Sequence, residues 1–287
     1  MVYLALTIGM LMSSSAAVLI RLCNAPALVV AAHRLGIAAL IVLPIAIYKH
    51  RTQLTSGTSR DRTALLFSGI FLGFHFAFWI SSLDHTSVAS SVLLVNTIPI
   101  FVGLGGWLIL KDPLGPRLVV GTVVSLIGSA LVALGDWGIG EHALIGDLLA
   151  LAGAVTVSGH LLIGRRQRQR LDLIPYIAIA NSVAALVLIG LALLSGHSLF
   201  GYDNQTYLLF FLLALGPQLL GHTSFNYALK QVSPSLIALV LLSEPLGSAT
   251  LAYLALGESP GLAFFWGAPV ILTGILLATW PQKTTSG

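Results

Sequence analysis

Ten long apolar segments, interrupted by charged residues, glycine or proline, account for most of the 287-residue sequence. Each is about 18 to 24 residues long, which matches the roughly 20 residues that an α-helix needs to cross the hydrocarbon core of a bilayer. A transmembrane β-barrel would instead need alternating segments of about ten residues, and the sequence has no such pattern. We therefore predict an all-α membrane protein. Its ten transmembrane helices are expected over residues 2–20, 27–48, 63–82, 87–110, 118–135, 144–164, 173–194, 206–227, 235–256 and 261–280.

The composition supports a membrane location for the whole chain. Hydrophobic residues make up 56% of the sequence and charged residues 8%, whereas a soluble domain carries about 25% charged residues. The ten segments leave only short connections, so there is no room for a separate domain outside the bilayer. The first segment starts at Val2 with no basic residue before it, and we interpret it as a retained helix. The single cysteine, Cys23, excludes an internal disulfide and any cysteine-based metal cluster.

Basic residues are distributed unequally between the two predicted sides of the membrane. Twelve of the fourteen Lys and Arg residues fall on the side that holds both termini, and Arg21 alone falls on the other. Because cytoplasmic loops are enriched in Lys and Arg, both termini are expected in the cytoplasm, with the chain in a bacterial cytoplasmic (inner) membrane. The remaining basic residue, Arg34, lies within the second segment. It is about 10 Å from the outer boundary, and we expect its side chain to extend outward to water.

The sequence repeats itself. Displacing the chain by 146 residues aligns 83–131 with 229–277 and gives twelve identities in 49 positions. Pro99 then aligns with Pro245, and backbone-special residues of this kind are more informative than the many leucines. Three glycine pairs also align: Gly115 with Gly261, Gly121 with Gly267, and Gly128 with Gly274. Within each aligned segment the last two of these glycines are seven residues apart, a spacing that favours tight helix packing.

This repeat predicts the organisation of the whole chain. The repeating unit contains five helices, with a first unit at 1–140 and a second at 141–287. An odd number of helices gives the two units opposite orientations in the membrane. Inverted repeats are typical of secondary transporters, whose substrate site lies near the midplane where the repeats meet.

Glu244 is the only acidic residue in the middle of a predicted helix. A charge at that depth costs roughly 2.5 to 3.5 kcal/mol on insertion scales, so it marks a candidate functional site. Pro245 follows it and frees a backbone carbonyl. Glu244 could contact a substrate amine or carry a coupling proton. Alternatively, a protonated Glu244 could stabilise the interrupted helix by bonding to its backbone.

Aromatic and polar side chains form two stripes at helical spacing. His75, Phe78 and Trp79 share one face of the third segment, and Gln218, His222 and Phe225 share one face of the eighth. We expect the two stripes to face each other, either as the wall of a substrate cavity or as ordinary helix packing.

Two further polar positions are candidates. Asn96 and Thr97 come before Pro99, as Leu242 and Ser243 come before Glu244 and Pro245 in the second half of the chain. Such residues can cap the carbonyls that proline frees or can reach a substrate carboxylate. His160 on the sixth segment is expected to line the cavity. The histidines in the segments lie on different helices without a paired ligand at i+4, so no metal site is predicted.

Several short stretches are similar to those of one known family. The chain resembles the EamA-type, ten-helix members of the drug/metabolite transporter superfamily over roughly residues 1–280. The stretches that carry the resemblance are Ala32–Ala39, Thr86–Ser91, Leu108–Asp112, Gly146–Leu151, Tyr227–Lys230, Ser243–Pro245 and Leu254–Glu258. The resemblance implies that the first, third, fourth, sixth, eighth and ninth helices line a central cavity, while the other four support it. It also implies export of small metabolites, with amino acids, including aromatic ones, as the best-known substrates.

Taken together, these features predict a secondary transporter that exports small metabolites by alternating access, most simply amino acids with aromatic or apolar side chains. An exporter of another small metabolite or drug is the alternative. The sequence has none of the motifs of a catalytic nucleophile or zinc protease, no nucleotide-binding loop and no channel filter. We therefore expect no enzymatic activity and no cofactor. The expected partners are a small-molecule substrate and the bilayer, with no nucleic acid, and a monomer is plausible.

Overall fold

A computed structural model describes residues 1–86, 88–111, 115–134, 143–256 and 262–279. Within these ranges the chain forms helices and no strand, which confirms the predicted all-helical class. Among the residues of the repeat alignment, Asp112, Glu258 and Gly261 lie outside the described residues.

The first half of the chain contains eight α-helices and one π-helix. They are α1 (Val2–Ser14), α2 (Ala16–Arg21), α3 (Ala27–Lys49), α4 (Arg51–Thr55), α5 (Ser59–Ser82), α6 (Val88–Val95), α7 (Ile98–Gly105), η1 (Gly106–Leu110) and α8 (Pro116–Leu134). The second half continues with α9 (Ala143–Gln167), α10 (Leu173–Leu194), α11 (Asn204–Leu213), the π-helix η2 (Ala214–His222), α12 (Thr223–Ala228), α13 (Pro234–Leu241), α14 (Glu244–Leu256) and α15 (Leu262–Thr279).

In the part of the chain that the structure describes, six helices are long and apolar enough to cross a membrane when continuous runs are counted as one. They are Val2–Arg21, Ala27–Lys49, Ser59–Ser82, Leu144–Gln167, Leu173–Leu194 and Asn204–Ala228. The other four predicted segments contain shorter apolar helices, at Ile98–Ile109, Pro116–Gly128, Pro234–Ser248 and Phe265–Leu277.

Polar residues fix where several helices begin. Before α5, Thr58 Oγ1 accepts a hydrogen bond from the Asp61 amide (3.2 Å), and Asp61 Oδ2 accepts one from the Thr58 amide (3.1 Å). This reciprocal pair satisfies two of the donors that every helix N-terminus leaves unpaired. Asp203 caps α11 and Ser233 caps α13 in the simpler one-sided way.

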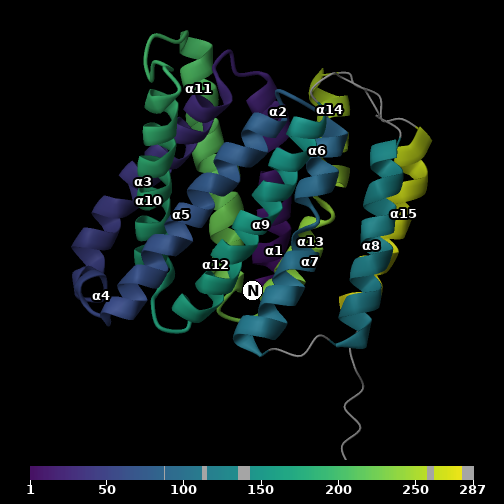
Figure 1. Cartoon of the computed structure of the whole chain (residues 1–287), viewed down its shortest axis with the longest axis horizontal. Helices are drawn as coiled ribbons and strands as arrows, with labels where there is room; N and C mark the ends of the chain where they lie inside the picture. The colour runs from purple at the N-terminus through teal and green to yellow at the C-terminus, as the bar shows by residue number, and fades with distance from the viewer. Residues whose placement is uncertain (87, 112–114, 135–142, 257–261, 280–287) are drawn as a thin grey trace, which may run out of the picture.

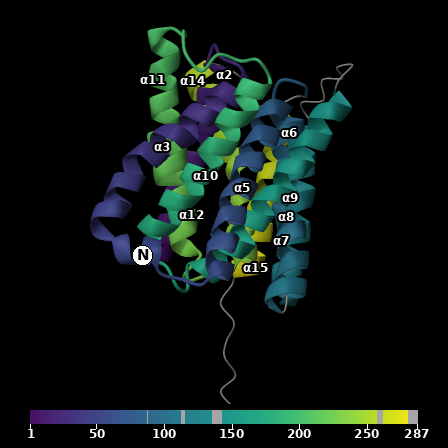
Figure 2. The ribbon, with the colours of Figure 1, turned by 60° about the vertical axis from the view of Figure 1, so that its left-hand side comes forward.

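The helices stand side by side in one bundle. In Figure 1, α3, α10 and α11 form one flank, α5, α9 and α1 run through the middle, and α8 and α15 form a pair at the opposite flank. Figure 2 shows the same bundle turned, with α5, α9 and α7 as neighbours. The most extensive packing joins α8 to α15, α5 to α9, and α3 to α10. The bundle therefore brings residues from both halves of the chain together at its centre.

Two interruptions occur at equivalent positions of the repeat. The chain breaks between α6 and α7 and again between α13 and α14. Thr97 Oγ1 donates to the Leu94 carbonyl (2.6 Å), and Ser243 Oγ donates to the Val240 carbonyl (2.6 Å). The two pairs are 146 residues apart, so the two hydroxyls bond in the same way at equivalent positions. The carbonyls that the prolines free are those of Val95 and Leu241, four residues before each proline. The hydroxyls of Thr97 and Ser243 instead bond to the carbonyl one residue earlier in each helix.

The glycines of α8 and α15 allow these helices to touch backbone to backbone. A Cβ added at Gly128 would lie 2.6 Å from the Ile271 amide nitrogen, and one added at Gly274 would lie 2.6 Å from the Ser125 amide nitrogen. Ser125 Oγ also donates to the Ile271 carbonyl (3.1 Å). Residues 128 and 274 are repeat equivalents, as are 125 and 271, so the contacts are reciprocal. Tight packing at these glycines is confirmed.

Candidate functional site

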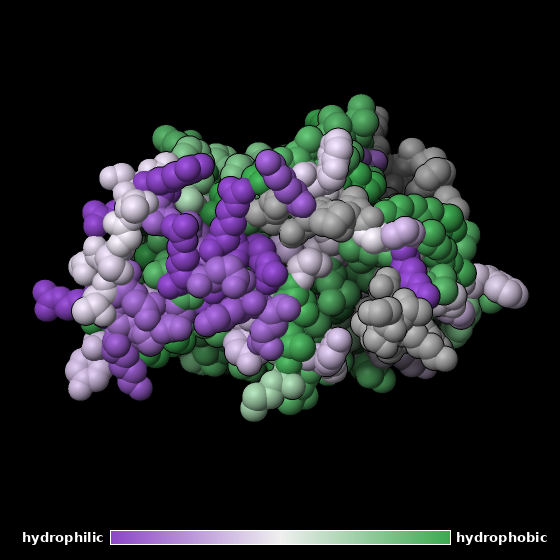
Figure 3. Space-filling model, turned by 90° about the horizontal axis from the view of Figure 1, so that it is seen from below, coloured by the Kyte–Doolittle hydropathy of each residue, from purple (hydrophilic) through white to green (hydrophobic). Residues whose placement is uncertain are grey.

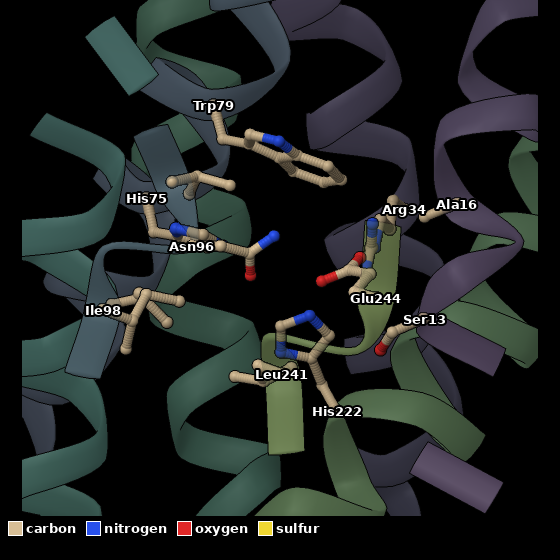
Figure 4. Close-up of a pocket in the computed structure, with 12 residues that line it drawn as sticks. Ser13, Ala16, Arg34, His75, Trp79, Asn96, Ile98, His222, Leu241 and Glu244 are labelled. Atoms are coloured by element: carbon tan, nitrogen blue, oxygen red, sulfur yellow. The ribbon is translucent and has the colours of Figure 1, made fainter. Parts of the chain in front are cut away.

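A small cavity lies at the centre of the bundle, where the helix interruptions meet (Figure 4). Its volume is about 30 Å³, which is enough for one or two water molecules. The residues that line it are Ser13, Ala16, Arg34, His75, Trp79, Val95, Asn96, Ile98, Val157, His222, Leu241 and Glu244. Each of the six spans that the resemblance implies contributes at least one of them. The second span, which was expected only to support the bundle, contributes Arg34.

The prediction that the Arg34 side chain extends outward to water is wrong. The side chain points into the bundle and is only 1% exposed. Its Nε donates to Gln218 Oε1 (3.0 Å), and its guanidinium carbon lies 4.3 Å from the centre of the Phe76 ring. A hydrogen bond and a cation–π contact, together with the Glu244 carboxyl facing the same cavity, offset the cost of burying the charge. The sequence could not indicate these partners because none of them is close to Arg34 along the chain. Extension of the side chain to water was therefore expected.

Glu244 faces the same cavity from the start of α14. Figure 4 shows its carboxylate, the Asn96 amide and the His222 ring pointing toward a common space, with Arg34 beside the carboxylate. Ser248 Oγ donates to the Ser14 carbonyl (3.0 Å), which ties α14 to α1 and fixes the direction of Glu244. The cavity is therefore lined by one basic and one acidic side chain.

Aromatic rings form the wall opposite this charge pair. His75 and Trp79 stack with an interplanar angle of 5°, and the His75 and His222 ring centres are 6.3 Å apart. The centres of the two predicted stripes thus meet. His75 Nδ1 lies 3.0 Å from the Gly153 carbonyl oxygen. Because a carbonyl only accepts, Nδ1 carries the proton, and Nε2 of the neutral ring is left as an acceptor.

Several buried polar atoms around the cavity have no partner among the described residues. They are Ser13 Oγ, Arg34 Nη1, Trp79 Nε1, Asn96 Nδ2 and Asn96 Oδ1. Each such atom costs about 1 to 3 kcal/mol when nothing satisfies it. Because they are concentrated around one cavity, we expect a polar ligand or water to supply their missing hydrogen bonds. Asn96 therefore differs from Thr97 beside it: the Thr97 hydroxyl bonds to the Leu94 carbonyl, whereas the Asn96 amide is presented to the cavity.

The π-helix η2 carries one residue that lines the cavity and one that supports it. It spans Ala214–His222 and contains Pro217, and π-helical turns occur frequently at functional sites. Gln218 bonds to Arg34 and also donates to Asn181 Oδ1 (3.1 Å), so it positions Arg34 and does not itself line the cavity. His222, one turn later, lines the cavity directly.

Two aromatic candidates, Phe78 and Phe225, lie outside the cavity lining. Phe78 stacks on Phe74 with ring centres 5.6 Å apart. Phe225 packs where a Cβ on Gly9 would stand, and its ring contacts His222 edge-on. Of the two alternatives for the stripes, helix packing therefore describes Phe78 and Phe225, while His75, Trp79 and His222 line the cavity.

His160 is also placed away from the cavity. Its Nδ1 lies 3.0 Å from the Ser68 carbonyl oxygen, and the Ser68 hydroxyl lies 2.9 Å from Tyr176 Oη. This buried network joins α9, α5 and α10, so the expectation that His160 lines the cavity is wrong. The two prolines, Pro99 and Pro245, open α7 and α14 as the sequence suggested.

No group of three or more His, Cys, Asp or Glu side chains able to hold a metal ion occurs in the described ranges. His33 stacks on Phe210 with ring centres 4.3 Å apart, and its Nδ1 lies 3.0 Å from the Val29 carbonyl oxygen. It follows that His33 packs α3 against α11 and is not part of the cavity.

Comparison with known proteins decides the family. The profile of the EamA-like transporter family matches residues 1–134 and matches again at residues 144–280. This chain belongs to the EamA-like transporter family. Together with the six long apolar helices, membership makes this EamA chain an integral membrane protein of a transporter family.

Relatives of this EamA chain are named as transporters without a stated substrate. An uncharacterized transporter of Archaeoglobus fulgidus is 25% identical over 77% of this chain and 76% of its own length. The uncharacterized transporter YdfC of Bacillus subtilis is 27% identical over 84% of this chain and 78% of its own length. A solved structure, described only as a crystal structure of a protein, matches with a TM-score of 0.81 at 19% identity, covering 97% of this chain and 96% of that chain. This last likeness shows the fold alone.

Proposed function

We propose that this EamA-family chain is a secondary transporter that exports amino acids by alternating access. The observation that carries the proposal is the presence of Arg34 and Glu244 on one central cavity. An amino acid carries a carboxylate and an ammonium group two bonds apart on the same carbon. Arg34 Nη1, which has no hydrogen-bond partner, would donate to the carboxylate, and Glu244 would accept from the ammonium group.

The remaining lining residues suggest which side chains are accepted. Trp79, His75 and His222 present ring faces and edges, while Ile98, Val157 and Leu241 are aliphatic. A wall of this kind favours an aromatic or apolar substrate side chain over a charged one. Asn96 would bond to whichever polar group of the substrate lies nearest.

The size of the cavity supports a transport cycle with an occluded state. A volume of about 30 Å³ cannot hold an amino acid, so the helices around it must separate for a substrate to enter. The interruptions at Thr97 and Ser243 are the natural hinges, because the backbone there lacks part of its helical hydrogen bonding. Opening toward one side and then the other would carry the substrate across.

The symmetry of the chain supports ten helices arranged as two inverted units, residues 1–140 and 141–287. The family profile matches twice, and the Gly128 and Gly274 contacts between α8 and α15 are reciprocal. A twofold axis through two antiparallel helices is what inverted repeats require. The distribution of Lys and Arg further favours cytoplasmic termini in a bacterial cytoplasmic membrane.

Counterflow in liposomes tests the proposal. Purified protein is reconstituted, the vesicles are loaded with unlabelled phenylalanine, and uptake of labelled phenylalanine is measured in competition with other amino acids. Phenylalaninamide, which lacks the carboxylate, and N-acetylphenylalanine, which lacks the ammonium group, are expected to compete at least about tenfold more weakly, the effect of losing one charged hydrogen bond. Trp79→Ala and His222→Ala should change the ranking of side chains, whereas His33→Gln, outside the cavity, should not.

Failure of every amino acid to drive counterflow in correctly folded protein would reject the proposal. Counterflow driven instead by a metabolite or drug without an amino-acid group would favour the alternative substrate class. An unchanged ranking in both aromatic variants would mean that the rings only pack the bundle.

A further inference from the structure

A second and much larger cavity opens at one end of the bundle. It has a volume of about 500 Å³ and lies between the start of α5 and the end of α9. Figure 3 views this end of the molecule, where hydrophilic side chains gather over one part of the surface. The cavity is lined by Arg60, Asp61, Ala64, Arg166, Gln167, Gln169 and Arg170. None of these residues belongs to the central cavity.

The lining carries a positive excess, since three arginines face one aspartate. The aspartate is already engaged: Asp61 Oδ1 lies 2.7 Å from Arg170 Nη1, and Asp61 Oδ2 accepts from Thr58. Arg166 Nη2 donates to the Ile109 carbonyl (2.6 Å), which holds its guanidinium at the rim. Among the described residues that line this cavity, two formal positive charges are therefore left without a balancing anion.

Gln167 supplies the second, independent observation. Its side chain lines the cavity and is only 5% exposed, and its Oε1 has no hydrogen-bond partner in the described part of the chain. A buried acceptor without a donor is costly, so a ligand that brings a donor would stabilise it. A ligand complementary to this cavity would therefore carry a negative group next to the arginines and a hydrogen-bond donor next to Gln167.

We propose that this cavity binds the headgroup of an anionic phospholipid whose phosphate carries a hydroxyl-bearing group, as in phosphatidylglycerol. The arginines would contact the phosphodiester, and Gln167 Oε1 would accept a hydrogen bond from the headgroup hydroxyl. A headgroup ammonium, as in phosphatidylethanolamine, could also donate, but the positive excess disfavours it. The cavity lies at the ends of two long apolar helices, which is where lipid headgroups are found and where basic pockets between helices bind them.

Native mass spectrometry of the detergent-purified protein tests the arginines. The protein is titrated with phosphatidylglycerol, phosphatidylethanolamine or phosphatidylcholine, with and without inorganic phosphate. Replacing both Arg60 and Arg166 by Gln is expected to weaken phosphatidylglycerol binding about 30-fold, at roughly 1 kcal/mol per basic residue near a membrane surface. Arg51→Gln is the matched control, because Arg51 is exposed near the same end of the bundle but outside the cavity.

An equal loss of binding free energy per removed charge in the Arg51 variant and the double variant would overturn the site, since diffuse surface charge would then explain binding. Competition by millimolar inorganic phosphate that removes the bound lipid would overturn the lipid as the ligand and indicate a free phosphate instead. Equal binding of phosphatidylcholine and phosphatidylglycerol would also overturn the proposal.

A second lipid pair tests Gln167. Phosphatidylmethanol carries the same phosphodiester charge but no hydroxyl. Wild-type protein should prefer phosphatidylglycerol to phosphatidylmethanol several-fold, the effect of one hydrogen bond, and Gln167→Met should remove that preference while leaving the melting temperature close to wild type. The absence of any preference in the wild type would overturn the assignment of Gln167.

Discussion

Replacing Arg34 by glutamine is expected to remove the ability of the transporter to distinguish an amino acid from its neutral amide. In the structure Arg34 Nε is engaged by Gln218 Oε1 at 3.0 Å, whereas Nη1 has no partner among the described residues. The proposed substrate carboxylate would therefore meet the free Nη1 group of a charged guanidinium. A glutamine at this position has neither the charge nor the reach to replace it.

The size of the effect follows from that single contact. A hydrogen bond involving a charged group contributes about 1.5 to 3 kcal/mol, and this energy corresponds to roughly a 10- to 150-fold ratio of affinities. Wild-type protein should therefore prefer phenylalanine to phenylalaninamide by a factor in this range. In the Arg34→Gln variant the ratio should fall to within about threefold of one, since no partner for the carboxylate charge is left.

Competition counterflow measures this ratio directly. Removing Arg34 also leaves Glu244 without its compensating charge, which is expected to reduce the amount of folded protein. The ratio of two competitors within one preparation is unaffected by that loss. His33→Gln, one residue earlier and outside the cavity, serves as the control and should keep the wild-type ratio. A ratio that stays above tenfold in the Arg34 variant would refute a carboxylate contact at Arg34.

Three further predictions concern coupling, packing and acid stability. Glu244→Gln should abolish the pH dependence of counterflow in the protein that folds, although loss of the partner of buried Arg34 should lower the folded yield, and unaltered pH dependence would exclude Glu244 as the coupling group. Gly274→Ala should lower the melting temperature, because its Cβ would lie 2.2 Å from Ser125 Oγ and 2.5 Å from the Gly121 carbonyl; overpacking of this kind costs about 1 to 3 kcal/mol, whereas Gly190→Ala, with nothing within 4 Å, should be neutral. At the start of α10, the hydrogen bond from Gln53 Nε2 and the nearby positive charges hold the pKa of Asp172 below its usual value. The ionised carboxyl therefore stabilises the fold above the unfolded pKa of about 3.9, and this contribution is lost as the pH falls through the lower folded value. The melting temperature of wild-type protein should thus fall more steeply below pH 4 than that of Asp172→Asn, and parallel curves would show that the Gln53 contact contributes nothing.

The helical class could be predicted from the sequence because the length of an apolar segment is a local property. The same is true of the interruptions: a proline two residues after a hydroxyl residue is visible at Thr97 and at Ser243, and the structure shows a helix break at both positions, with each hydroxyl bonded to a carbonyl three residues earlier. The glycines of α8 and α15 could be identified from the repeat register alone. In each case the physical cause lies within a few residues of its effect.

The cavity could be predicted only in part because its geometry depends on contacts between distant residues. Arg34 and Gln218 are 184 residues apart, and their hydrogen bond turns a side chain that was expected to reach water toward the centre. One signal was available: Glu244 is a single intramembrane acid, and a single basic residue within another segment is its natural partner. Ser13 carried no comparable signal, because its hydroxyl resembles those of its neighbours in sequence.

Helical spacing also overstated the width of the cavity wall. Positions three and four apart share a face, but the face that meets the cavity is narrower than the stripe. His75 and Trp79 line the cavity, while Phe78 turns toward Phe74. In the eighth span the π-helix changes the residues per turn, so His222 reaches the cavity while Phe225 packs under Gly9. Periodicity alone contains no information about either effect.

Accessibility of a cysteine in the central cavity tests the proposed mechanism most directly. The chain has one cysteine, Cys23, so Ser13→Cys in a Cys23→Ser background places a single thiol on the cavity lining. In proteoliposomes, a membrane-impermeant thiol reagent should modify this cysteine when added from either side, and a transported amino acid should slow both reactions. A control thiol at Ser56, which is exposed outside the spans, should react from one side only. Modification of the Ser13 position from only one side, or from neither, would contradict alternating access through this cavity.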